Sequence, residues 1–186
     1  MGRRPIWLVG MMGAGKSAVG PLLAQRMDRR FVDSDHEIER SAGMSVSEIF
    51  STEGERAFRD RERQVVGELS SGTDVVALGG GTIAQPGAAA LLQRTGTVVY
   101  LKASAGALLD RLGDCSDRPL LQGLSAEERL AALESLLAER ASAYESASIE
   151  VDTEGRTLES VVEEIRLRLD SSRSGREGGV EKGVRV

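Results

Sequence analysis

Cysteine, aromatic residues and long apolar runs are all scarce in this chain of 186 residues. Its single cysteine, Cys115, excludes an intrachain disulfide and fits a reducing compartment, so we expect a cytoplasmic protein. Aromatic residues make up only 3%, and the core must therefore rest on Leu, Val, Ala and Ile. No apolar stretch is long enough to span a membrane, and the run after the N-terminal arginines is too short for a signal peptide.

Asparagine is absent altogether. Guanine-nucleotide switches read their base with an Asn-Lys-x-Asp motif, so its absence argues against that class. The net charge of −5 comes without a block of like charge, which argues against nucleic acid as a partner because such proteins usually carry a basic patch. The remaining composition, 40% apolar and 28% charged, is typical of one globular domain with its own core.

Short strand-like runs alternate with segments of helical spacing. The expected strands are Ile6–Val9, Arg30–Asp33, Val75–Leu78, Thr97–Leu101 and Ser148–Val151. Because no hairpin signals join them, the pattern predicts a parallel sheet covered by helices on both faces, with ligands at the carboxyl ends of the strands. Pro21 should kink the first helix. Residues 171–186 are rich in Gly, Ser and charge, and we expect a disordered tail behind a domain of residues 1–170.

A phosphate-binding loop follows the first expected strand. The sequence GMMGAGKS from Gly10 to Ser17 fits the pattern G-x-x-x-x-G-K-[ST] between a strand and a helix. Its backbone N–H groups would close on phosphate oxygens, Lys16 would reach the terminal phosphates of ATP, and Ser17 would ligate Mg²⁺. The other nucleotide contacts expected here come from Gly13, Ala14, Gly15 and Ala18.

The acidic residue that usually accompanies such a loop is missing after Val75–Leu78, which is followed by glycines. The segment FVDSDHE supplies one instead. Asp33 and Asp35 lie two apart, so on an extended chain end both would point to the same side at the carboxyl edge of the sheet. We expect Asp33 to orient the waters of Mg²⁺ and Asp35 to accept a hydrogen bond from an attacking hydroxyl. The alternative is that the pair only caps the following helix.

Several longer motifs share one order along the chain: GMMGAGKS, DSD, FSTEGERAFRDRE, GGG, RPLL and ERASAY. In this order and approximate spacing the chain resembles the shikimate kinases, from about Ile6 to about Leu169. The resemblance implies a nucleoside-monophosphate-kinase-like fold, a three-layer αβα sandwich around a five-stranded parallel sheet. It also implies transfer of the γ-phosphate of ATP to the 3-hydroxyl of shikimate, and we expect a monomer.

The resemblance also implies an acceptor pocket. Its substrate-binding positions match Asp35, Arg59, Gly80 and Arg140, and we include the flanking Gly79 and Gly81. The residue types suit the task. The planar guanidinium of arginine binds both oxygens of a carboxylate, and Glu62, three residues after Arg59 on an expected helix, can fix its aim. Glycine lets bare backbone N–H groups approach the ring.

A glycine-bounded stretch, GDCSDRPLLQG, shows no periodicity and indicates a lid at about residues 113–124. Arg118 within it matches the lid arginine of the family, which reaches the transferring phosphate, and joins Lys16 and Asp35 as an expected catalytic residue. Arg111 and Arg156 match positions that flank adenine.

Two other readings remain open at this point. A gluconate kinase or another small-polyol kinase would share the phosphate loop and a carboxylate-bearing acceptor, but would not be expected to combine the glycine run with Arg59 and Glu62. A nucleotide-binding regulator without catalysis is the other interpretation. The residues that argue against it are the intact Lys16, Asp33, Asp35 and Arg118.

Overall fold

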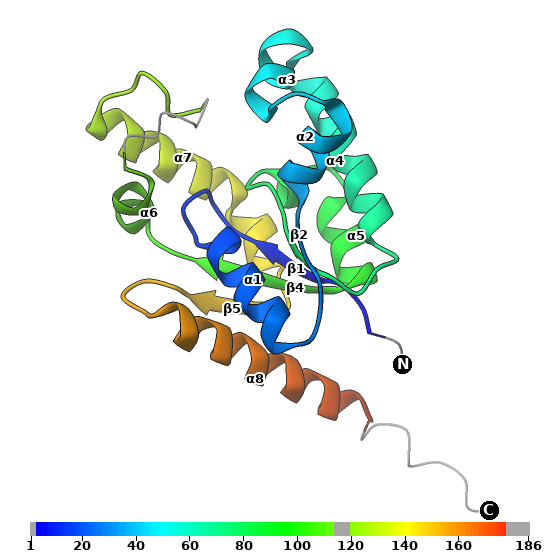
Figure 1. Cartoon of the computed structure of the whole chain (residues 1–186). Coiled ribbons are helices and arrows are strands. Elements are labelled where there is room, and N and C mark those ends of the chain that lie inside the picture. The colour runs from blue at the N-terminus through cyan, green and yellow to red at the C-terminus, as the bar shows by residue number, and fades with distance from the viewer. Residues whose placement is uncertain (1–2, 114–119, 178–186) are drawn as a thin grey trace, which may run out of the picture.

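A five-stranded parallel sheet lies at the centre of the computed structural model, which describes residues 3–113 and 120–177 (Figure 1). The strands run in the order β2-β3-β1-β4-β5, and every pairing is parallel. Their bounds are β1 Ile6–Val9, β2 Phe31–Asp33, β3 Val75–Ala77, β4 Thr97–Lys102 and β5 Ile149–Asp152. The sequence analysis therefore predicts all of these strands to within about one residue at each end.

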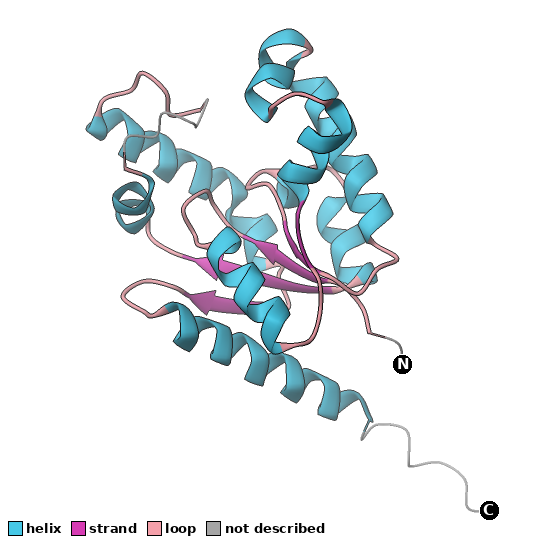
Figure 2. Ribbon diagram, viewed as in Figure 1, coloured by secondary structure: helices cyan, strands magenta, loops and turns pink. Residues whose placement is uncertain are grey.

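Helices cover both faces of the sheet (Figure 2). Their bounds are α1 Lys16–Arg26, α2 Ser34–Ala42, α3 Val46–Thr52, α4 Gly54–Leu69, α5 Ala88–Thr95, α6 Ala105–Leu112, α7 Ala126–Glu145 and α8 Leu158–Glu177, with a short 3₁₀ turn η1 at Thr82–Ala84. Helices α1 and α8 pack side by side on one face. The other face carries α5 and α7, and α2, α3 and α4 pack together at the carboxyl edge of the sheet. The three-layer αβα prediction is confirmed.

The central strand explains why the phosphate loop is held firmly. All of Ile6–Val9 is buried, as expected for a continuous apolar run with a strand on either side and a helix on either face. At Gly20 in α1, a Cβ would lie 2.1 Å from a ring carbon of Phe31, so only glycine lets α1 lie this close to β2. The loop between β1 and α1 is thus anchored at both ends in the core.

Two helices differ from the sequence-based expectations or add to them. Helix α5 lies in a segment for which no helix is expected, although its sequence AAALLQRT is amphipathic. Helix α8 continues to Glu177, past the expected boundary at residue 170, because extending a formed helix adds a hydrogen bond per residue without a new nucleation cost. The rest of the expected tail, residues 178–186, lies outside the described residues. Within 3–113 and 120–177, no helix combines the length and apolarity of a membrane span.

Candidate active site

The phosphate loop joins β1 to α1 and holds its backbone in conformations that favour glycine. Gly10, Gly13 and Gly15 all have positive φ, and a Cβ at Gly10 would lie 2.5 Å from the carbonyl oxygen of Leu101 in β4. The Lys16 ammonium group donates to the carbonyl oxygens of Gly10 at 2.7 Å and Met11 at 3.0 Å. The lysine therefore folds back over its own loop, at the mouth of the cradle where a phosphate would lie.

Ser17 and Asp33 form a second polar contact beside this loop. The Ser17 hydroxyl donates to a carboxylate oxygen of Asp33 at 3.2 Å. Asp33 ends β2, and β3, which lies between β2 and β1, is followed by glycines instead of bulky side chains. A hydroxyl and a carboxylate suit Mg²⁺, which usually takes one or two protein oxygens together with substrate phosphates and water. The donor set therefore fits the ion expected from the sequence.

The expected geometry of the Asp33 and Asp35 pair is wrong in one respect. Asp35 does not continue an extended strand but lies in the first turn of α2, because Asp33 is the N-cap of that helix. The backbone N–H of Asp35 donates to the Asp33 carboxylate at 3.0 Å. Asp33 thus caps α2 through one carboxylate oxygen and contacts Ser17 through the other. The helix-capping role and a place beside the phosphate loop therefore belong to the same side chain.

Asp35 lies in an unusual electrostatic position. Burial raises its pKa to about 6, with further raising by the charges of Asp33 and Glu62, while Lys16 opposes the shift. Among the described residues, its Oδ1 atom is buried and has no hydrogen-bond partner. A Cβ at Gly79 would lie 3.0 Å from this oxygen. A carboxylate oxygen held in this way is ready to accept a hydrogen bond from a ligand.

An ion-pair network holds Arg59 on the acceptor side. Its guanidinium donates to Glu62 at 2.6 Å and to Glu55 at 3.0 Å, all on α4. Glu62 is only 2% exposed, and its other oxygen accepts a 2.6 Å hydrogen bond from the Thr82 hydroxyl. The predicted pairing of Arg59 with Glu62 is present. Thr82 was not predicted, because no sequence pattern marks a threonine after a glycine run as the partner of a glutamate on a distant helix.

The glycine run Gly79–Gly81 lies between two arginines. A Cβ at Gly81 would lie 3.2 Å from two nitrogens of Arg59, and one at Gly80 would lie 3.6 Å from a nitrogen of Arg140. Arg140, on α7, is 7% exposed and contacts the Met11 sulfur at 3.8 Å. The structure therefore brings Arg59, Arg140 and the glycine run together, as the sequence predicts. The placement also puts this loop beside the buried oxygen of Asp35.

The two arginines expected near adenine lie in different settings. Arg111, on α6, contacts the carbonyl oxygen of Gly13 in the phosphate loop at 3.4 Å and both the side chain and carbonyl oxygen of Thr153. Arg156 instead contacts the Asp152 carbonyl oxygen at 3.3 Å and pairs with Glu164 on α8. Arg111 is thus next to the phosphate loop, whereas the contacts of Arg156 go to β5 and α8.

Residues 114–119, half of the expected lid, lie outside the described residues, and Arg118 with them. Its C-terminal part is described. Leu121 is fully buried in the main core, and the neighbouring Leu120 is 54% exposed. Gln122 lines a groove of about 460 Å³ together with Ser47 and Phe50 of α3. This part of the expected lid is thus held in the core by Leu121 and faces α3 across the groove.

Comparisons with known proteins identify the family of this chain. The family model for shikimate kinase matches residues 12–170. A shikimate kinase of Chlorobium chlorochromatii is 44% identical over 171 residues, which cover 89% of this chain and 90% of that protein. The chain belongs to the shikimate kinase family. Membership makes it an ATP-dependent kinase and accounts for the motifs that a phosphate loop alone does not predict.

Solved shikimate kinases share the whole fold. The enzyme from Acinetobacter baumannii, determined in complex with shikimate, matches with a TM-score of 0.84 and 40% identity over 92% of this chain and 94% of that one. The shikimate kinase from Aquifex aeolicus matches with a TM-score of 0.78 and 35% identity, over 91% of this chain and 98% of that one. A gluconokinase from Sinorhizobium meliloti matches with a TM-score of 0.59 and 16% identity, over 96% of this chain and 98% of that one. At this identity the likeness is one of fold alone.

Proposed function

We propose that this chain transfers the γ-phosphate of ATP to the 3-hydroxyl of shikimate, with Mg²⁺ as the cofactor. One observation carries the proposal beyond family membership. The Oδ1 atom of Asp35, buried and without a hydrogen-bond partner within residues 3–113 and 120–177, lies beside the glycine run. Arg59 and Arg140 lie next to the same run. A small ring that carries both a carboxylate and hydroxyls matches this set, because the arginines bind the acid and the aspartate accepts from a hydroxyl.

The nucleotide is held on the phosphate-loop side. The backbone of Gly13–Ala18 and the N-terminus of α1 bind the phosphates, and Lys16 turns from its loop carbonyls to the terminal phosphates. Ser17 and Asp33 would hold Mg²⁺, directly or through water, and the bound ion would supply positive charge to the phosphates of ATP. Arg111 and Arg156 flank adenine, and Arg111 has the more direct position because it already contacts the loop at Gly13.

The acceptor lies on the other side of the glycine run. Asp35 orients the 3-hydroxyl and takes its proton as the phosphoryl group transfers. Arg59 and Arg140 bind the carboxylate and so fix the position of the ring. Arg118 supplies positive charge to the transferring phosphate, and this role rests on its match to the lid arginine of the family. The monomeric state and the cytoplasmic location stay predictions, as does the lack of a nucleic-acid or membrane partner.

A substrate panel tests the proposal. The protein is incubated with Mg·ATP and shikimate, quinate, gluconate or a nucleoside monophosphate, and ADP release is measured. We expect turnover with shikimate alone at a substantial rate. Preferred turnover of gluconate would replace the acceptor assignment, and no turnover with any acceptor would favour a nucleotide-binding regulator.

Two lysine variants check the nucleotide side. We expect Lys16→Ala to abolish transfer in a folded protein, because the Lys16 charge serves phosphate instead of the core. Lys102→Ala is the matched control, since Lys102 is half-exposed and pairs with Glu150 on the neighbouring strand. Near-normal kcat in Lys16→Ala would contradict the phosphate-loop assignment.

A further inference from the structure

The glycine run is fixed by the last residue of the ERASAY motif, a side chain to which the resemblance assigns no role. The Tyr144 hydroxyl, on α7, donates to the carbonyl oxygen of Gly80 at 2.6 Å. Tyr144 is 1% exposed and lies one helical turn after Arg140, so both side chains lie on the face of α7 that meets the glycine run. Burial raises the pKa of Tyr144 to about 12 although Arg140 lowers it, and the hydroxyl therefore remains a donor at any working pH.

This hydrogen bond sets the direction of a whole peptide group. In a planar trans peptide the C=O of one residue and the N–H of the next point in opposite directions, so holding the Gly80 carbonyl also aims the Gly81 N–H away from Tyr144. Among the described residues, no hydrogen bond uses the N–H of Gly80 or Gly81. Two backbone donors thus lie between Arg59 and Arg140 without a protein partner, while the neighbouring carbonyl is fixed.

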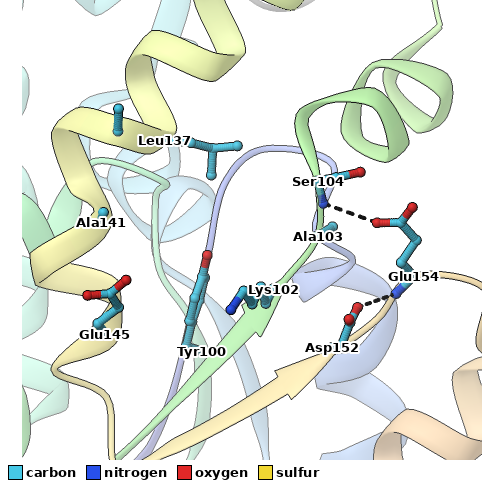
Figure 3. A pocket seen from close by; sticks show the side chains of 10 residues that line it. Tyr100, Lys102, Ala103, Ser104, Leu137, Ala141, Glu145, Asp152 and Glu154 are labelled. Atoms are coloured by element: carbon cyan, nitrogen blue, oxygen red, sulfur yellow. Dashed lines mark hydrogen bonds between the residues drawn. The ribbon is translucent and has the colours of Figure 1, made fainter.

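The ring of Tyr144 is in turn held by Tyr100 in β4. The two rings stack with centroids 4.8 Å apart and planes inclined by 7°. Tyr100 also lines a groove of about 440 Å³ together with Leu137, Ala141 and Glu145 of α7 (Figure 3). The groove is lined by the carboxylates Glu145, Asp152 and Glu154 and by the ammonium group of Lys102. The Tyr100 ring backs Tyr144, and among the described residues no hydrogen bond joins it to the glycine run.

We propose that Tyr144 is a positioning residue for the acceptor: its hydrogen bond to the Gly80 carbonyl holds the Gly81 N–H group, which belongs to the same peptide, toward shikimate. The proposal rests on the proposed function. Tyr144 does not touch the reacting atoms. It acts on binding through the orientation of the Gly80–Gly81 peptide group and through the interaction of its hydroxyl with Arg140. Its loss should therefore weaken acceptor binding more than it slows transfer, and it should leave the nucleotide side nearly unchanged.

Two single-atom variants test this role. Tyr144→Phe removes the hydroxyl and keeps the stacked ring. Tyr100→Phe is the matched control, because it removes a hydroxyl from the other ring of the same stack but no hydrogen bond to the glycine run. We expect Tyr144→Phe to raise both the Kd of shikimate, measured by calorimetry, and its KM by about five- to tenfold. The KM for ATP should change by less than about twofold, and Tyr100→Phe should match the wild type in all of these values.

The outcomes separate this proposal from the proposed function. If the wild-type protein neither binds nor phosphorylates shikimate, both proposals fail. If the wild type turns over shikimate and Tyr144→Phe keeps its Kd and KM, only the positioning role is overturned. Equal rises in the KM of shikimate and of ATP, or the same defect in Tyr100→Phe, would also overturn it, because they indicate a general loss of packing.

A second measurement does not depend on Tyr144→Phe folding. The chain has two tyrosines, so 3-fluorotyrosine in the Tyr100→Phe background labels Tyr144 alone. We expect shikimate to shift the ¹⁹F resonance of Tyr144 and Mg·ATP alone to leave it in place. An unchanged ¹⁹F chemical shift of Tyr144 at saturating shikimate would contradict the positioning role.

Discussion

The Ser17 hydroxyl donates to the Asp33 carboxylate at 3.2 Å. Ser17 lies at the start of α1, which follows β1, and Asp33 ends β2, which is separated from β1 by β3. If both groups serve Mg²⁺, Asp33→Asn should raise the Mg²⁺ concentration needed for half-maximal rate by about tenfold or more. Asparagine is also a good N-cap, so α2 should stay intact. Initial rates against Mg²⁺ concentration at fixed ATP measure the effect.

Asp60→Asn provides the control for this variant, because Asp60 lies exposed on α4 and pairs only with Arg63 among the described residues. Its Mg²⁺ dependence should equal that of the wild type. An unchanged Mg²⁺ requirement in Asp33→Asn would remove Asp33 from the metal site.

Asp35 should make the rate of the reaction fall at acidic pH, which gives the pH–rate profile an acidic limb. Burial raises its pKa to about 6, and a general base is active only when deprotonated. We expect kcat/KM for shikimate to fall as the pH drops below about 6. Asp35→Asn should lower kcat by about 10²–10⁴-fold and abolish this limb. A limb that persists in a residually active Asp35→Asn enzyme would assign the ionisation to another group.

The same shift predicts a change in stability of known sign. Between about pH 4 and pH 6 the folded chain binds a proton at Asp35 that the unfolded chain has already released, so the free energy of unfolding falls as the pH rises through this window. Above it, the buried charge remains destabilising. Asp35→Asn should therefore be more stable than the wild type at pH 8, by on the order of 2–3 kcal/mol, and the gain should vanish near pH 4. Urea unfolding at both pH values tests this; equal stability at pH 8 would contradict the burial of the charge.

Alanine at the adjacent Gly79 and Gly80 should affect the thermal stability of the protein differently. A Cβ at Gly80 would meet its nearest protein atoms at 3.5 Å and φ there is not positive, so Gly80→Ala should fold with an unchanged Tm. It should nevertheless raise the KM for shikimate, because the methyl group occupies space on the ligand side. A Cβ at Gly79 would lie 2.8 Å from the Glu62 oxygen that Thr82 holds, so Gly79→Ala should lower Tm as well as activity. Thermal unfolding and KM of the pair decide; a normal KM in Gly80→Ala would remove the glycine run from the acceptor pocket.

Arg59 should matter through its shape as well as its charge. Glu62 and Glu55 hold its guanidinium from one side. Arg59→Ala should cost about 2–5 kcal/mol of shikimate binding with little change in the KM for ATP, and Arg59→Lys should recover only part of it. The control is shikimate with its carboxylate converted to a carboxamide. The wild type should discriminate strongly against the amide and Arg59→Ala much less; an equal preference in both would mean that Arg59 does not bind the acid.

The local sequence was sufficient for the elements and for several single roles. The apolar run Ile6–Val9 and the glycine-rich loop after it specify a buried strand and a phosphate cradle through short-range sterics and burial. The capping box of Ser45 and Glu48 at the start of α3 is likewise a local feature, because its partners lie within one turn. The motif likeness added the acceptor residues, which spacing alone does not identify.

Only the tertiary structure decided how these pieces meet. The Asp33 cap of α2 is local, but the contact of its other carboxylate oxygen with Ser17 depends on how α1 packs beside β2. The Thr82 contact with Glu62 and the Tyr144 contact with Gly80 join residues far apart in sequence. Such contacts depend on how α4 and α7 pack around the sheet, so the sequence named the chemical groups of the site while packing fixed their directions.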